Sequence, residues 1–131
     1  MFNGIILNQG VVKKILKRSK GINLFLKSNL KVTNKNLGIS VSCDGVCLTL
    51  ISVKDKLIEF YLSNETLKRS KFKSIKIGDY INLELPLKKS QKISGHICQG
   101  HVDTTAKIIK ISKKDKSIIY DFNINNIFKK Q

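Results

Sequence analysis

The stretch ISVSCDGVCLTLISV, residues 39–53, contains Asp44-Gly45 between two runs of apolar and small residues. This pattern is typical of a two-residue β-hairpin turn, because a type I′ turn needs positive φ at both central positions. The turn also sets the pairing register of the two strands. We therefore expect four cross-strand pairs, namely Cys43 with Val46, Ser42 with Cys47, Val41 with Leu48 and Ser40 with Thr49.

Side chains alternate along a strand, so the hairpin should have two different faces. The apolar face carries Ile39, Val41, Cys43, Val46, Leu48 and Leu50. The other face carries Ser40, Ser42, Cys47 and Thr49. Taken alone, the pattern favours an ordinary solvated face over a ligand pocket. The cysteine within it weakens that interpretation, since free cysteine is usually buried.

The rest of the chain repeats the strand pattern as short runs rich in Ile, Val and Leu. The further candidates are FNGIIL (2–7), GVVKKIL (10–16), INLFLK (22–27), LIEFYLS (57–63) and DYINLELP (79–86). One helix is expected over 64–72, where Asn64 would cap it and Glu65 would lie in its first turn. Short strands at regular spacing predict an all-β protein built on a small antiparallel barrel with one short helix.

The chain is strongly basic, with 25 Lys and Arg residues against 9 Asp and Glu residues. Clustered cations bind nucleic acid by releasing counterions. However, only Arg18 and Arg69 are arginine, the residue best suited to clamp phosphates, and the lysines are scattered. The composition therefore favours solvated lysines over an RNA-binding surface, which stays open as an alternative.

The three cysteines, Cys43, Cys47 and Cys98, are too few for a disulfide framework. Reduced thiols favour a cytoplasmic protein. The first residues lack the features of an export signal, and no run of about eighteen apolar residues suggests a membrane span.

A second copy of the N-terminal pattern begins after the single proline, Pro86, and the polar linker-like stretch that follows it. Moving the sequence by 96 positions places Gly4 on Gly100, Val12 on Ile108, Lys14 on Lys110, Ile15 on Ile111 and Lys17 on Lys113. Repetition at about the length of a small domain indicates duplicated barrels. We expect a first barrel over residues 1–90 and the start of an incomplete second barrel over residues 91–131.

Five ordered stretches resemble motifs of the α chain of riboflavin synthase, of the lumazine-binding barrel family. They are MFNGII (1–6), DGVCLTL (44–50), NETLKRS (64–70), IGDYINLE (77–84) and GHICQGHVD (95–103). The resemblance implies six-stranded antiparallel Greek-key barrels, a homotrimer and no cofactor. It also implies a transferase in which two molecules of 6,7-dimethyl-8-ribityllumazine exchange a four-carbon unit. The products would be riboflavin and 5-amino-6-ribitylamino-pyrimidinedione.

Carried over by position, the resemblance implies that Ser40, Cys47 and His101 form the chemical group, with His101 a candidate for proton transfer. It implies substrate-binding roles for Phe2, Gly4, Thr49, Glu65, Thr66 and Thr104. In this family one reactive site forms between the first barrel of one subunit and the second barrel of a neighbour. A chain with an incomplete second barrel should then catalyse poorly alone, and a non-catalytic lumazine- or flavin-binding barrel is the alternative.

His96, Cys98 and His101 lie close together in the sequence and could suggest a metal site. In an extended strand His96 and Cys98 share one face, and His101 falls on the other unless Gly100 bends the chain. We therefore expect no metal there, and we interpret Gly100 and His101 as the junction between the two copies.

Overall fold

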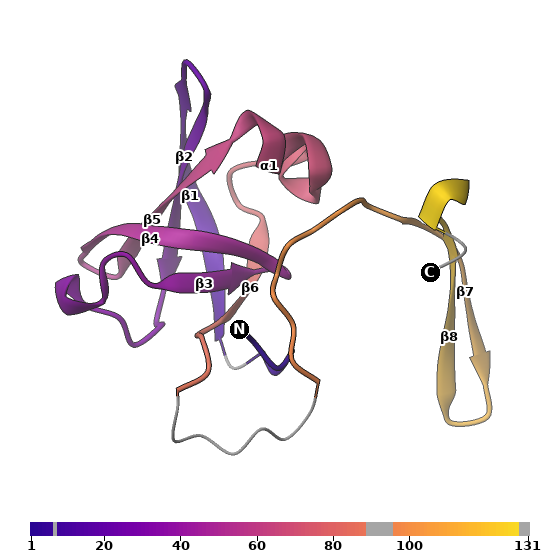
Figure 1. Cartoon of the computed structure of the whole chain (residues 1–131). Helices are drawn as coiled ribbons and strands as arrows, with labels where there is room; N and C mark the ends of the chain where they lie inside the picture. The colour runs from indigo at the N-terminus through magenta and orange to yellow at the C-terminus, as the bar shows by residue number, and fades with distance from the viewer. Residues whose placement is uncertain (7, 89–95, 129–131) are drawn as a thin grey trace.

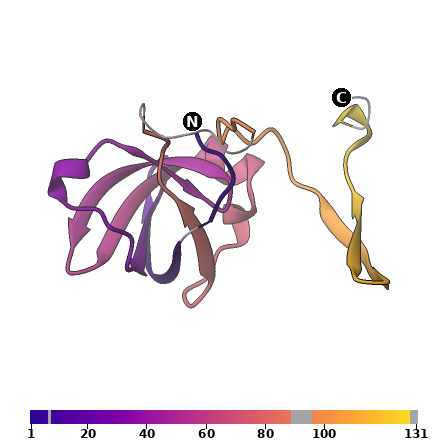
Figure 2. The ribbon, with the colours of Figure 1, turned by 90° about the horizontal axis from the view of Figure 1, so that it is seen from below.

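The computed structural model describes residues 1–6, 8–88 and 96–128. Six strands form a closed antiparallel barrel in the order β1-β2-β5-β4-β3-β6 (Figures 1 and 2). The strands are β1 (Asn8–Arg18), β2 (Gly21–Ser28), β3 (Ser40–Cys43), β4 (Val46–Lys54), β5 (Leu57–Ser63) and β6 (Tyr80–Glu84). Hairpins join β3, β4 and β5, and β6 returns to lie beside β3, which is Greek-key connectivity. The predicted all-β barrel is confirmed.

The β3–β4 hairpin has the predicted register and faces. All four expected cross-strand pairs are present, from Cys43 with Val46 to Ser40 with Thr49. The residues of the apolar face line the core: Val41, Cys43, Val46, Leu48 and Leu50 are at most 7% exposed. Ile39 is half-buried against the same core. Asp44 and Gly45 take the positive φ values of 47° and 84° that the turn needs.

Inward side chains from the remaining four strands, β1, β2, β5 and β6, fill the rest of the barrel. Among the fully buried residues are Val12, Leu24, Leu26, Ile58, Phe60, Leu62, Ile81 and Leu83. Burial of one such side chain stabilises a fold by about 1.5–3 kcal/mol. The register shifts once in β1, between Val12 and Lys14, and once in β4, between Leu50 and Ser52. Each bulge changes the inward face and increases the local twist that closes a small barrel.

The helix is shorter than predicted, and a different residue caps it. Helix α1 spans Asn64–Arg69 and is followed by the 3₁₀ turn η2 (Lys71–Ser74). Ser63, the last residue of β5, is the N-cap, and its hydroxyl accepts a hydrogen bond from the Thr66 N–H. The prediction that Asn64 caps the helix is therefore wrong. Two further 3₁₀ turns are η1 (Asn34–Asn36) and η3 (Asn126–Phe128). No helix of the described residues is long and apolar enough to cross a membrane.

The prediction of a strand at residues 2–7 is also wrong, because residues 2–6, the part that the structure describes, do not form one. Phe2 makes only an isolated antiparallel bridge, to Cys98. The N–H of each residue donates to the carbonyl of the other at 2.8 Å. Beyond Cys98, the carbonyl of Gly100 accepts a hydrogen bond from the Cys47 N–H at 2.8 Å. We call residues 98–102 the crossing segment, because they return from beyond the linker to lie against the barrel (Figure 1).

A second hairpin follows the crossing segment and pairs only with itself within the described chain. It consists of β7 (Lys107–Lys114) and β8 (Ser117–Asn123). Each of its pairs repeats a pair of β1–β2 at the offset of 96, as Ile108 with Phe122 repeats Val12 with Leu26. Its register shift, between Ile108 and Lys110, is at the equivalent position. The expected domain boundary at residues 90–91 lies outside the described residues.

Gly21 should be the least replaceable glycine of the barrel. A Cβ at this position would lie 2.0 Å from the carbonyl oxygen of Leu62, whereas a Cβ at Gly38 would meet open space. We expect Gly21→Ala to cost about 3 kcal/mol or more in the free energy of unfolding, because backbone must move. Gly38→Ala should cost about 1 kcal/mol, from its positive φ alone. Denaturant unfolding of both variants checks this, and equal losses would contradict it.

Candidate functional site

A cavity of about 140 Å³ opens beside the β3–β4 turn. Its first wall is the start of β4, where Val46 faces the core and the next residue, Cys47, faces outward and is half-buried. Cys47 pairs across the hairpin with Ser42, which is only 3% exposed. The polar face of the hairpin is therefore covered at this end, and the solvated-face interpretation does not hold there.

The second wall is helix α1 and the residue that ends it. Glu65, Thr66, Arg69 and Ser70 line the cavity. Residues four apart lie on the same side of a helix, so Arg69 lies on the side of Glu65, and Ser70 lies on the side of Thr66. The Ser70 hydroxyl donates to the Thr66 carbonyl at 2.6 Å and accepts from the Phe72 N–H. With Ser63 capping the other end, both ends of the helix are hydrogen-bonded.

The third wall is the crossing segment, which supplies Gly100, His101 and Val102. Gly100 is required there, because a Cβ would lie 3.0 Å from the Cys47 Cβ and 3.1 Å from the Cys47 nitrogen. Its φ of 77° also favours glycine. Val102 packs against the core cluster, so the segment is anchored on both sides of His101.

Four of the predicted site residues therefore meet in one cavity: Cys47, Glu65, Thr66 and His101. Ser40 and Thr49 pair with each other on the same face of the hairpin but do not line this cavity. Thr49 lies two residues beyond Cys47, about 7 Å along the strand. The structure thus separates Ser40 from the other two residues predicted to form the chemical group.

The remaining predicted residues line two neighbouring cavities. Thr104 lines one of about 270 Å³, which shares Glu65 and Arg69 with the first cavity and so adjoins it along the helix. Phe2 and Gly4 line another of about 440 Å³, which shares Gly100. Phe2 is 1% exposed, so it supports this region as a buried side chain.

Arg69 and Ser70 are site residues that the sequence interpretation missed. The available signal was helical spacing, because they lie four residues after the predicted Glu65 and Thr66. Arg69 donates a hydrogen bond to Glu65, and this bond together with the positive charge lowers the pKa of Glu65. Glu65 is therefore an ionised hydrogen-bond acceptor at neutral pH.

Metal-binding and thiol chemistry are limited by the positions of the side chains. Within the described ranges, no group of three or more His, Cys, Asp or Glu side chains is placed to hold a metal ion. All three cysteines are free. Burial raises the pKa of Cys43 well above its usual value, and the neighbouring Asp44 and Cys47 act in the same direction. Cys43 is therefore an inert core thiol.

The fold and the cavity define a class of protein: a small closed β-barrel with a cavity beside the β3–β4 turn, walled by a hairpin, a short helix and a segment from beyond the linker. The family described as lumazine binding domain matches residues 3–86. The chain belongs to this family.

Three curated relatives are 30–40% identical to the chain over the aligned residues. A riboflavin synthase of Chlamydia pneumoniae is 40% identical over 86% of this chain and 57% of its own length. One of Buchnera aphidicola subsp. Baizongia pistaciae is 38% identical over 82% of this chain and 51% of its own. A riboflavin synthase of Bacillus amyloliquefaciens is 30% identical over 95% of this chain and 58% of its own length. The chain thus spans about half the length of these relatives.

Solved structures support the fold. A crystal structure of LumP complexed with riboflavin superposes with a TM-score of 0.81 at 18% identity, covering 99% of this chain and 71% of that one. A structure of LumP with 6,7-dimethyl-8-(1′-D-ribityl) lumazine gives a TM-score of 0.78 at 18% identity, covering 96% and 70%. An alignment over 99% of the chain includes the β7–β8 hairpin as well as the barrel.

The three cysteines should differ in reactivity with a thiol reagent. We expect Cys98, which is exposed, to react first, and Cys47, which is half-buried, to react more slowly. Cys43 should react only after denaturation, because it is buried and its thiolate is disfavoured. Counting the thiols that Ellman's reagent modifies, with Cys98→Ser as the control that removes the fast phase, checks this order. A third thiol that reacts in the native protein would contradict it.

Proposed function

We propose that the chain carries the first substrate site of a riboflavin synthase, a transferase that dismutates two molecules of 6,7-dimethyl-8-ribityllumazine. The observation that carries the proposal is the meeting of Cys47, Glu65, Thr66 and His101 in one cavity of a lumazine-binding-domain barrel. The identity to curated riboflavin synthases over most of the chain supports the reaction.

The chemistry of the cavity suits a ribityl ligand. The ionised Glu65 can accept hydrogen bonds from the hydroxyls of a ribityl chain, and the Thr66 hydroxyl can accept or donate. The adjoining cavity with Thr104 continues the polar lining along α1. The heterocycle would lie toward Cys47, where the hairpin and the crossing segment are closest. Thr49 and Ser40 would lie further along the same face.

In the reaction that we propose, atoms are only redistributed between two identical molecules, so no oxidant or reductant is consumed. The donor loses a proton from its 7-methyl group, and the resulting anion is delocalised into the ring. The protein must orient two rings and move protons. His101 is the titratable side chain that the crossing segment places at the cavity, and we assign it to proton transfer. Cys47 and Ser40 would contact or activate the acceptor.

The site would be completed by a second surface. The reaction brings two lumazine rings together, and the site described above would hold one of them. We therefore propose that another copy of the chain completes the site in a homo-oligomer, the trimer that the family resemblance implies. Free cysteines support a reducing, cytoplasmic location.

We further propose that residues 91–131 begin a second barrel and that residues 1–90 form the first. The repetition of the β1–β2 register in β7–β8 supports this division. In the second hairpin Tyr120 and Phe122 occupy the positions of Leu24 and Leu26, which point into the first barrel. Both aromatic side chains are about half exposed, at 47% and 57%.

Binding of 6,7-dimethyl-8-ribityllumazine is the first test. We expect the full chain to change the fluorescence of this compound on titration. Thr66→Val should weaken binding by about tenfold, the cost of roughly one lost hydrogen bond. Ser74→Ala, which removes an exposed hydroxyl from the nearby η2 turn, should leave the dissociation constant within about twofold. Absence of binding would overturn the proposal, and binding without riboflavin formation would favour the non-catalytic ligand carrier.

The role of His101 is tested by the rate of riboflavin formation. We expect His101→Ala to lower this rate by about 10²-fold or more, as for the loss of a general acid or base. Its lumazine affinity should change little in comparison. His96→Ala is the matched control, since His96 is exposed and does not line the cavity. An unchanged rate in His101→Ala would remove this residue from the mechanism.

A further inference from the structure

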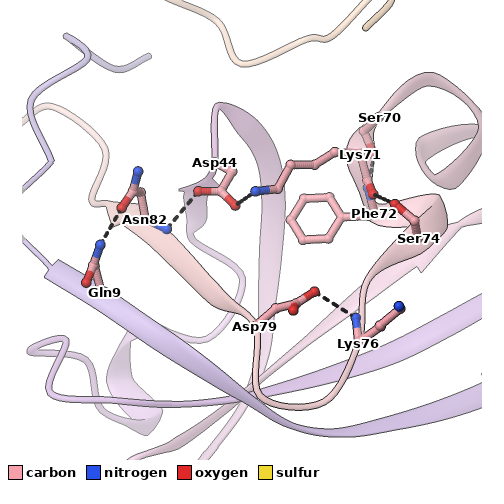
Figure 3. A network of polar contacts seen from close by, with 9 residues as sticks. All are labelled: Gln9, Asp44, Ser70, Lys71, Phe72, Ser74, Lys76, Asp79 and Asn82. Carbon is pink, nitrogen blue, oxygen red and sulfur yellow. Dashed lines mark hydrogen bonds and ion pairs between the residues drawn. The ribbon is translucent and has the colours of Figure 1, made fainter. Parts of the chain in front are cut away.

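The walls of the cavity are formed by segments distant in sequence, so something must set the spacing between them. The β4 wall and the crossing segment are joined by the hydrogen bond from the Cys47 N–H to the Gly100 carbonyl. The β4 wall and the helical wall are joined differently. Lys71 follows directly after the wall residue Ser70, and its Nζ lies 2.6 Å from Oδ2 of Asp44 in the β3–β4 turn. Figure 3 shows this contact bridging the turn and η2.

Asp44 is held rigidly on the barrel side of the contact. Its N–H donates to the Asn82 carbonyl at 2.9 Å, and its Oδ1 accepts from the Asn82 N–H at 2.8 Å. Asn82 is itself tied to β1, since its side-chain oxygen accepts from Gln9 at 2.9 Å. Only Oδ2 of Asp44 points to the helical side, and Lys71 is its one polar partner within the described residues. The carboxylate is thus a fixed point on the barrel.

Among the residues that the structure describes, the helical wall has no other polar connection to the turn. In the described part of the chain, no further hydrogen bond or ion pair joins residues 44–50 to α1 or η2. The Glu65–Arg69 pair stays within the helix. Phe72 is 1% exposed and packs into the core, which holds this segment against the barrel. Apolar packing of this kind is non-directional. A directional bond, from the Asn64 N–H to the Lys20 carbonyl at 3.0 Å, holds the start of the helix, so the contact of Lys71 sets the lateral position of the wall at its η2 end.

Resting on the proposed function, we propose that the Asp44–Lys71 ion pair is a positioning clamp that sets the distance between Cys47 and the Thr66–Ser70 wall. Neither residue of the pair needs to touch the heterocycle for this role. Lysine at position 71 is therefore a determinant of lumazine affinity, acting through the width of the cavity.

Two substitutions remove the clamp with little other change. Lys71→Met keeps the aliphatic stem and loses the charge. Asp44→Asn keeps an oxygen for the Asn82 N–H and a residue type that tolerates positive φ. Lys71→Arg keeps the charge, so the ion pair with Asp44 and the lumazine affinity should be retained. Lys73→Met removes another exposed lysine of the same turn and is the matched control.

We expect Lys71→Met and Asp44→Asn each to raise the dissociation constant for 6,7-dimethyl-8-ribityllumazine about fivefold, the upper range for a half-exposed ion pair. The double variant should bind no more weakly than Asp44→Asn alone. Lys73→Met and Lys71→Arg should stay within about twofold of the wild type. Additive losses, or an Lys71→Met affinity equal to that of Lys73→Met, would overturn the clamp.

A second readout needs no ligand and separates this proposal from the proposed function. In a Cys98→Ser background, iodoacetamide labelling of native protein, well below its melting temperature, reports access to Cys47. We expect labelling about fivefold faster in Lys71→Met than in Lys73→Met. Equal labelling rates would overturn the clamp. If the wild type does not bind lumazine, the proposed function fails, and the labelling rates still decide whether the ion pair sets the cavity width.

Discussion

The β3–β4 turn depends on two consecutive residues in the left-handed backbone region, Asp44 at φ 47° and Gly45 at φ 84°. This conformation sets which residues face each other across the hairpin, and a slip by one residue would turn every side chain to the opposite face. Val46 would then leave the core, and Cys47 would enter it. The same turn carries the Asp44 carboxylate, so one local conformation determines both the outward position of Cys47 and the contact with Lys71.

The cavity is built from parts that the barrel brings together from distant positions. The turn supplies one wall, α1 a second and residues 100–102 a third. Each wall has its own anchor: the Asn82 pair for the turn, the hydrogen bond from the Asn64 N–H to the Lys20 carbonyl for the helix, and the Phe2–Cys98 bridge for the crossing segment. The barrel strands hold the anchor points of the walls in place, and the contacts between the walls set the width of the cavity.

Features that depend on local geometry could be predicted from the sequence. The Asp-Gly turn and alternation predicted the hairpin register and both faces, and comparison of the two halves of the sequence predicted the offset of 96 between the β1–β2 and β7–β8 pairs. The helix cap could not be predicted as well, because Ser63 and Asn64 are both good capping residues and the end of β5 decides between them. The ion-pair partner of Asp44 could not be predicted for another reason. Lys71 is one of 25 basic residues, and only the fold places it at the turn.

The crossing segment makes the first cavity depend on residues that follow the linker. A ligand that touches Cys47 and also Gly100 or His101 gains contacts only while this segment is docked on the barrel. Binding and docking are then thermodynamically linked, and each must favour the other by the same free energy.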